Sequence, residues 1–471
     1  MTKYLLLVPE TLVVAGAAAM LLLGRFSTSR YRRWRSSLPA VAVAVLLIAA
    51  AVELRAGADV NTYFGGALLV DRFGLFVKLA VLLATAAGIA VADWGAEDSL
   101  ALGLAMPMLA AFGVMVVASS GDFVGVWAGL ELAGAAGVVM LALRRPDAGL
   151  RLLLLSAAAS ALMLIGLGYV YASVGTAELG GVHGALLGAA PTLPLALPVL
   201  VLLGALIYRA ALAPLQVGAA HALMPPSPMS IGLVAGLAAA AAVVAAVKIS
   251  VAVGPVSAVY SPYIEIVAAL AMAGGGAAAM AVRAPRARLA FLAAGQTGWV
   301  IAGLGTEFRT GVGAAVFLLG ALVVAATAAP AAAGGAGISE LAVSGLATLR
   351  PARAAALSLA MLSLAGAPPL AGFFGEFTIA AALARSGHLE LLAVGLLGSL
   401  LSLVAAVGTI RVLYLQNPPE EGRRGLPALP VWTRFSTLGA VALCAVIAGY
   451  GLFANPIFSL ADQGAEALGL K

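Results

Sequence analysis

Phe123-Val-Gly-Val-Trp-Ala-Gly-Leu-Glu131-Leu-Ala-Gly-Ala-Ala-Gly-Val-Val-Met-Leu-Ala-Leu143 is an apolar stretch with the length of a membrane-spanning helix, and it carries one acid near its centre. An ionised side chain at that depth costs roughly 2.5 to 3.5 kcal/mol on insertion scales. Such groups usually have a partner or a water path. The first hypothesis for Glu131 is therefore that it takes part in the movement of ions or protons. The alternative is structural, with a protonated carboxyl hydrogen-bonded to a neighbouring helix.

The composition extends this conclusion to the whole chain. Hydrophobic residues make up 63% and charged residues 10% of the 471 residues, whereas soluble domains carry about 25% charged residues. The apolar runs are continuous and do not alternate, which predicts an all-α integral membrane protein and not a barrel. The first of these runs, which contains Pro9-Glu10, is interpreted as a retained span and not as a signal peptide.

Cofactor chemistry has little support in the residues. The single cysteine, Cys444, excludes an intrachain disulfide and a cysteine-ligated cluster, and the three histidines show no metal-binding spacing. A glycine-rich phosphate loop is not found where it would be needed. We therefore expect no nucleotide, flavin, haem, iron–sulfur or metal site in this chain.

Apolar windows predict about fourteen spans. They centre on 4–24, 38–54, 73–93, 100–119, 123–143, 150–173, 192–222, 229–253, 261–282, 289–305, 311–330, 353–385, 390–416 and 435–455. The segments 192–222 and 353–385 are long and contain prolines, which remove a backbone donor and clash with the preceding turn. Both are therefore expected to be broken helices, near Pro194, Pro198 and Pro214 in the first and near Pro368-Pro369 in the second.

Basic residues predict the orientation. Sixteen arginines fall in the odd-numbered connectors and four in the even-numbered ones. The odd connectors hold Arg25, Arg30, Arg32, Arg33, Arg35, Arg144, Arg145, Arg151, Arg283, Arg286, Arg288, Arg350, Arg353, Arg423, Arg424 and Arg434, and the even ones hold Arg55, Arg72, Arg309 and Arg385. The positive-inside rule then places the odd connectors in the cytoplasm and both termini on the outer, periplasmic side.

An internal duplication is also predicted. Spans four to eight and nine to thirteen each contain five helices, with a broken helix fourth in each set, and an odd number of helices inverts the second copy. The expected organisation is an N-terminal three-helix region (1–99), a first repeat (100–253), a second repeat (261–416) and a C-terminal helix and tail (417–471).

Other ionisable groups fall within the predicted spans. They are Lys78, Arg209, Lys248, Glu265, Glu376 and Arg411. Their spread along the chain and their mixed signs suit a lateral proton relay, in which each site responds to the charge of its neighbour. Lys248, Glu265 and Arg411 lie near predicted helix ends, so snorkelling to the interface is the favoured interpretation for them. Arginine does not release its proton, so Arg209 is expected to act as a fixed charge that tunes Glu131.

Five stretches carry a resemblance to a known family. They are Leu7–Glu10, Asp71–Lys78, Ser120–Leu132, Arg286–Trp299 and Leu362–Phe377. The last is the most specific, because its order of small residues, prolines and glycines is hard to reach by chance. Over nearly its whole length the chain resembles the subunit N group of the antiporter-like family. Members of this family occur in proton-pumping NADH–quinone oxidoreductase (respiratory complex I), in Mrp-type sodium/proton antiporters and in membrane-bound hydrogenases.

The chain departs from the family pattern at several titratable positions. Arg209 stands at the seventh-span lysine, Gln216 at the following histidine, and Ala238–Ala242 at the central eighth-span lysine. Gln296 stands at the tenth-span histidine. Glu376 stands where subunit N usually has lysine, which is more similar to subunit M.

The resemblance implies a membrane-arm translocase subunit in a bacterial inner membrane, which moves protons as other subunits reduce quinone. NAD, FMN, iron–sulfur clusters and quinone would be bound by partner subunits, and no nucleic acid is expected to bind. The implied proton path runs through Glu131, Arg209 and Glu376, with Lys248, Gln296 and Arg411 as weaker candidates. The missing lysines keep open a non-pumping structural or assembly subunit, and an Mrp-type antiporter or a hydrogenase subunit is a further alternative.

Overall fold

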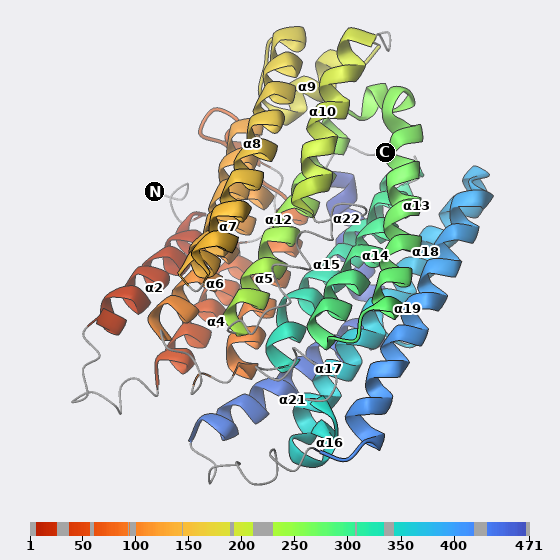
Figure 1. Ribbon diagram of the computed structural model, residues 1–471. Coiled ribbons are helices and arrows are strands. Elements are labelled where there is room, and N and C mark those ends of the chain that lie inside the picture. Colours follow the sequence, from red (N-terminus) through yellow and green to blue (C-terminus); the bar gives the residue numbers. More distant parts are fainter. Residues whose placement is uncertain are drawn as a thin grey trace.

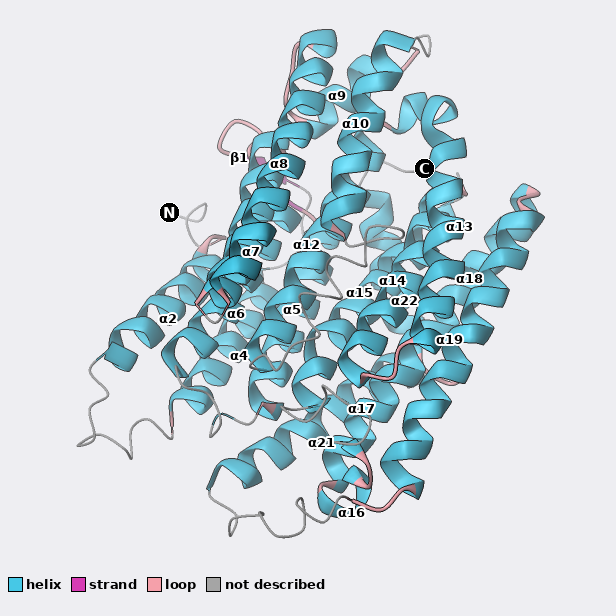
Figure 2. Cartoon of the chain, in the orientation of Figure 1, coloured by secondary structure: helices cyan, strands magenta, loops and turns pink. Residues whose placement is uncertain are grey.

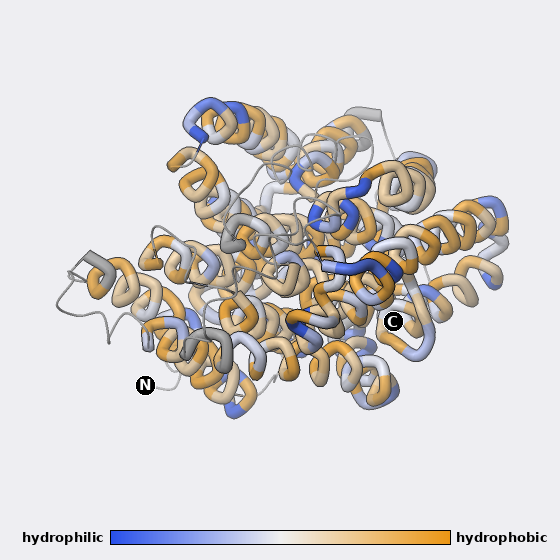
Figure 3. Tube along the Cα trace, turned by 60° about the horizontal axis from the view of Figure 1, so that its bottom comes forward, coloured by the Kyte–Doolittle hydropathy of each residue, from blue (hydrophilic) through white to orange (hydrophobic). Residues whose placement is uncertain are grey.

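The structure is a computed structural model that describes residues 6–25, 37–56, 61–92, 94, 100–143, 145–188, 193–210, 229–306, 309–333, 343–418 and 431–467. Nearly all of them lie in long helices packed side by side (Figures 1 and 2), which confirms the predicted all-α membrane fold. Apolar residues run along the helices, and polar residues gather toward helix ends and connectors (Figure 3).

The helices follow the predicted spans closely. The N-terminal region holds α2 (Val8–Arg25), α4 (Leu38–Ala56) and α5 (Arg72–Val91). The first predicted repeat holds α6 (Leu100–Ser119), α7 (Phe123–Ala142), α8 (Pro146–Val174), α9 (Leu179–Leu186), α10 (Leu193–Arg209) and α12 (Met229–Ala252). The second holds α13 (Ser257–Ala281), α14 (Pro285–Leu304), α15 (Arg309–Ala333), α16 (Leu346–Leu349), α17 (Pro351–Leu364), α18 (Ala371–Ser386) and α19 (Leu389–Leu415). A 3₁₀ turn, η3 (Gly254–Val256), joins α12 to α13, and α21 (Val431–Leu452) and α22 (Ala454–Ala467) end the described chain.

Ten of the described helices are long and apolar enough to cross a membrane. Each of the fourteen predicted spans overlaps a described helix or helix pair, but several of these helices are shorter or less apolar than a full crossing requires. The number fourteen and the outward position of the termini therefore stay predictions.

Close helix crossings recur in the two predicted repeats. Gly113 on α6 lies so close to α7 that a Cβ atom there would be 2.7 Å from the carbonyl oxygen of Gly129. Gly275 on α13 lies equally close to α14, where a Cβ would be 2.6 Å from the backbone nitrogen of Gly295. Small residues allow such approach between membrane helices. In both regions the helix that follows the crossing glycine carries a candidate site residue, Glu131 or Gln296.

The predicted break in the segment 353–385 is confirmed. Helix α17 ends at Leu364 and α18 begins at Ala371, with Pro368-Pro369 in the turn between them. In the segment 192–222, α10 continues through Pro198 to Arg209, so the helix is not interrupted at that proline. The predicted break at Pro214 and the residue Gln216 lie outside the described residues.

A short hairpin, which was not predicted, lies between α4 and α5. Strands β1 (Asn61–Tyr63) and β2 (Leu68–Val70) pair antiparallel between α4 and α5, and Leu68 also bridges to Ser120. A Cβ at Gly121 would be 2.0 Å from the carbonyl oxygen of Gly66, so the turn between α6 and α7 has room only for glycine there. The hairpin thereby fixes the end of α6 against the start of α7.

Among the described residues, three of the sixteen arginines that set the predicted orientation, Arg286, Arg288 and Arg353, are buried within the protein. Arg288 donates hydrogen bonds to the carbonyls of Ala279 and Val282 at the end of α13, and Arg353 donates to that of Val91 at the end of α5. Helix C-termini carry unpaired carbonyls and partial negative charge, which these guanidinium groups satisfy. Part of the charge asymmetry therefore has a packing role as well.

Candidate charged sites within the helix bundle

The structure joins Glu131 and Arg209 in an ion pair. Helix α7 begins after Asp122, whose carboxylate accepts a hydrogen bond from the Gly125 backbone amide at 2.6 Å, and it places Glu131 in its middle. Arg209 ends α10, with one terminal nitrogen 2.5 Å from Glu131 Oε1. Its other terminal nitrogen donates to the Leu130 carbonyl oxygen at 3.0 Å. Arg209 is thus held by two acceptors on α7.

The two partners differ in their exposure. The Arg209 side chain is 7% exposed and the Glu131 side chain 35%. Gly134, one turn beyond Leu130, leaves room for the guanidinium, because a Cβ there would be 3.0 Å from it. The cation is therefore enclosed by protein, and the carboxylate keeps an open side that a proton or water could approach.

Glu376 lies in a second polar site, buried between α14, α18 and α19. The amide of Gln296 and the hydroxyl of Ser399 donate to its two carboxyl oxygens, the latter at 2.7 Å. The Ser399 hydroxyl accepts a hydrogen bond from Trp299 Nε1 at 2.9 Å. Within the part of the chain that the structure describes, Glu376 has no ion-pair partner. Its carboxyl is therefore held by neutral donors alone.

The helix break positions Glu376. Gly366, in the turn between α17 and α18, has a φ of +69°, and a Cβ there would lie 2.4 Å from Glu376 Oε2. Glycine adopts this left-handed conformation without strain and leaves the space that the carboxyl fills. The turn and the first helical turns of α18 therefore form the wall of the site.

The snorkelling interpretation of Lys248 was wrong. Lys248 is 2% exposed, and its ammonium donates to the carbonyl oxygens of Ala118 and Ser120 at 2.6 and 2.5 Å. The end of α6 supplies unpaired carbonyls, which attract a cation. The side chain therefore turns into the protein, against the terminus of another helix, and does not reach toward a lipid interface.

The remaining candidates lie apart from these sites. Glu265 is about a third exposed and lies 3.4 Å from the His388 imidazole. Arg411 is exposed on α19, and it stands twelve residues beyond Ser399, about 18 Å along the helix axis. His388 was not expected to pair with Glu265, and a contact between α13 and the start of α19 has no local sequence signal.

Between the two glutamate sites lies an apolar cavity. It has about 30 Å³ of room for water-sized molecules, and helices α10, α12, α13 and α14 line it. The lining is aliphatic apart from the hydroxyls of Ser250 and Thr297. Two of its wall residues, Val243 and Ala246, lie on α12 within about one turn after Ala238–Ala242, the stretch where the family lysine would stand. The volume would hold about two waters, but a water in a protein needs two to four polar partners.

One further charged cluster joins α2, α4 and α5. Lys78 Nζ lies 2.6 Å from Glu10 Oε1 and 3.3 Å from Glu53 Oε1, and all three side chains are buried. Lys78 and Glu10 stand out separately in the sequence, whereas Glu53 has no local signal that marks it. Among the described residues, no group of three histidine, cysteine or acidic side chains could hold a metal ion.

Comparison with known proteins relates this arrangement to a family. Residues 120–402 match the model of the NADH:quinone oxidoreductase/Mrp antiporter transmembrane family. A curated relative from Moorella thermoacetica, NADH-quinone oxidoreductase subunit N, is 30% identical, and the alignment covers 90% of this chain and 92% of the relative. The protein of the same name from Paramagnetospirillum magneticum is 28% identical over 98% of this chain and 97% of its own.

Solved structures share the fold. A chain of respiratory complex I from Thermus thermophilus superposes with a TM-score of 0.77 at 24% identity, covering 96% of this chain and 99% of its own. A chain of the Mrp complex from Dietzia gives 0.80 at 21% identity, covering 98% of this chain and 97% of its own. The matched region contains Glu131, Arg209, Lys248, Gln296 and Glu376. The chain therefore belongs to the NADH:quinone oxidoreductase/Mrp antiporter family of membrane proteins.

Proposed function

We propose that this chain is a membrane-arm subunit of a proton-translocating NADH–quinone oxidoreductase and moves protons across a bacterial inner membrane while other subunits reduce quinone. The observation that carries the proposal is the ion pair of Glu131 with Arg209 inside the helix bundle, within the region that matches the family. The relatives named subunit N, which align with nearly the whole chain, favour this assignment over a free-standing antiporter. Both termini would face the periplasm.

The chain would work as part of an enzyme without carrying a redox centre. Partner membrane subunits would flank it, and NAD, FMN, iron–sulfur clusters and quinone would be bound elsewhere in the complex. Glu131 would take up the proton on its open side, and Arg209 would remain charged and set the affinity of that carboxylate for a proton. Glu376 would receive and release a proton in the second half, with the Gln296 amide holding its carboxyl in place.

The test is Glu131→Gln in the assembled complex, because the amide keeps the size of the side chain and cannot bind a proton. We expect proton pumping per electron to fall to a small fraction of the wild-type value, measured with a pH-sensitive dye in inverted membrane vesicles during NADH oxidation. Glu390→Gln, an exposed acid at the start of α19, is the matched control and should pump normally. Wild-type pumping by the Glu131 variant would contradict the proposed function.

A second candidate function has one observation in its favour. The apolar cavity lies where the eighth-span lysine is missing, and a proton does not cross an aliphatic gap without polar groups or water. A subunit with such a gap would maintain the architecture of the complex without pumping. In that case Glu131→Gln would leave the proton-to-electron ratio unchanged, while removal of the whole subunit would prevent assembly.

A further inference from the structure

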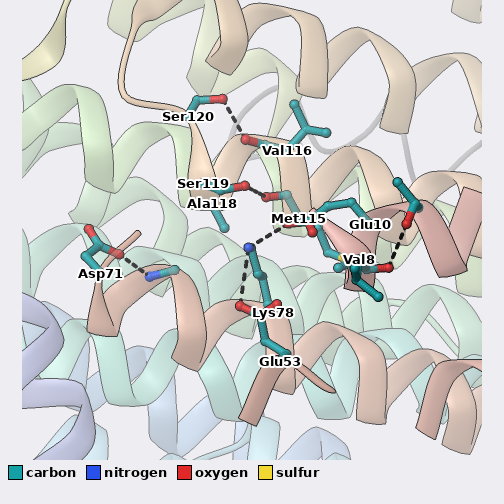
Figure 4. A network of polar contacts seen from close by, with 12 residues as sticks. Val8, Glu10, Glu53, Asp71, Lys78, Met115, Val116, Ala118, Ser119 and Ser120 are labelled. Atoms are coloured by element: carbon teal, nitrogen blue, oxygen red, sulfur yellow. Dashed lines mark hydrogen bonds and ion pairs between the residues drawn. The ribbon is translucent and has the colours of Figure 1, made fainter. Parts of the chain in front are cut away.

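The Glu10, Glu53 and Lys78 cluster lies outside both predicted repeats and has no part in the proton path described above. Its members come from three helices, near one end of α2, α4 and α5. Figure 4 shows the Lys78 ammonium pointing at the two carboxyl groups, with Asp71 farther along the same helix. The side chains are 6% to 8% exposed, so water from outside the protein does not solvate these charges.

The charges of this cluster do not balance. Two ionised carboxylates and one ammonium would leave one negative charge in a buried site, and an uncompensated buried charge is strongly unfavourable. Two carboxyl groups that share a site generally avoid this by retaining a proton on one of them. Glu10 Oε2 is buried and has no hydrogen-bond partner among the described residues, so it is an oxygen on which such a proton could reside.

Asp71 links this cluster to Lys248. It precedes α5 and lies seven residues before Lys78, which places both on one face of the helix about 10 Å apart along its axis. Its carboxylate accepts a hydrogen bond from the Gly74 amide, and a Cβ at Gly74 would be 3.4 Å from the Ala118 carbonyl oxygen that binds Lys248. Asp71 interacts electrostatically with both Lys248 and Lys78.

We propose that Glu10, Glu53 and Lys78 form an additional proton-binding site in the N-terminal three-helix region, which exchanges protons with the first repeat through Asp71 and Lys248. The inference rests on the proposed function, since it extends the path of the same protons. In the loaded form Lys78 is an ammonium, one carboxyl is protonated and the cluster is neutral. On release the proton leaves that carboxyl toward Lys248 by way of Asp71, and the cluster carries one negative charge until a proton returns by the same route.

The experiment is infrared difference spectroscopy of the whole complex in lipid during a pH titration, followed in the stretching region of protonated carboxyl groups. We expect wild type to show a carboxyl band that Glu53→Gln removes, because the remaining Glu10 and Lys78 pair is neutral without an extra proton. Glu10→Gln should remove the same band, which guards against a folding defect peculiar to one variant. Glu390→Gln is the matched control and should retain it.

The same samples also separate this inference from the proposed function. We expect Glu53→Gln to lower the number of protons pumped per electron while the complex assembles normally on native gels. If Glu131→Gln abolishes pumping but both cluster variants keep the band and the wild-type ratio, the cluster is only a structural ion pair and the inference is overturned. If Glu131→Gln has no effect on pumping, the proposed function itself fails, whatever the spectra show.

Discussion

The two glutamate sites occupy comparable places in the two predicted repeats but differ in how their charge is held. Glu131 follows the α6–α7 crossing and pairs with a guanidinium from the end of α10. Glu376 follows the helix break at the start of α18 and contacts the amide of Gln296, which follows the α13–α14 crossing. The first acid has a permanent cation beside it, and the second has neutral donors only. Similar helix packing therefore supports one acid that is paired with a fixed cation and one that is held by neutral donors.

The largest expected difference concerns the backbone that frames the two sites. A Cβ at Gly372, in the first turn of α18, would be 1.7 Å from the carbonyl oxygen of Ser363, whereas Gly204 on α10 has no atom within 4 Å of the same position. We expect Gly372→Ala to destabilise the subunit by more than about 4 kcal/mol, because the new methyl group would force the backbone at Ser363 to move. Gly204→Ala should be tolerated. The amount of assembled complex on native gels measures both, and equal yields would show that the break is not held by this contact.

A smaller effect is expected from removing the donor at each site. Arg209→Met leaves the Glu131 carboxylate unpaired and should cost roughly 3 kcal/mol, at the low end for buried pairs because Glu131 is partly exposed. Gln296→Met removes a neutral donor from Glu376 and should cost about 1.5 kcal/mol, since that carboxyl can take a proton. The temperature at which the complex loses this subunit compares them. If that temperature falls further in Gln296→Met than in Arg209→Met, the predicted order of the two sites is wrong.

The smallest effect distinguishes two similar tryptophan–serine bonds. Trp127 donates to Ser160 in the first repeat, and Trp299 donates to Ser399 in the second. Ser399 also donates to Glu376, so Ser399→Ala should cost about 1 kcal/mol more than Ser160→Ala, the net contribution of one hydrogen bond. The same thermal assay applies, with tryptophan fluorescence as a check that the half-buried Trp127 and the buried Trp299 keep their surroundings. Identical shifts would mean that Ser399 contributes nothing to holding Glu376.

Local patterns predicted the features that depend on neighbouring residues in the chain. Apolar runs of membrane length predicted the helices, and Pro368-Pro369 predicted the break before α18. We expected Arg209 to act as a fixed charge that tunes Glu131, and the structure joins the two side chains in an ion pair across 78 residues of sequence. Their roles in proton transfer stay predictions.

The misjudged residue, Lys248, illustrates the limit of local patterns. Its place near the end of a span predicted an interfacial side chain, and distance from a helix end is the only local signal available. Its acceptors belong to α6, about 130 residues earlier in the chain. The hairpin that fixes the end of α6 comes from a third segment, β1 and β2.

The sequence by itself determined that this is a helical membrane protein with a few costly charges. Apolar runs, prolines and glycines affect the backbone only within a few residues along the chain, so their effects can be predicted locally. The tertiary structure alone decided which charges meet, because ion pairs depend on how helices distant in the chain cross and rotate against one another. It placed Glu53 beside Lys78, turned Lys248 onto the end of α6, and left an aliphatic cavity between the two glutamate sites.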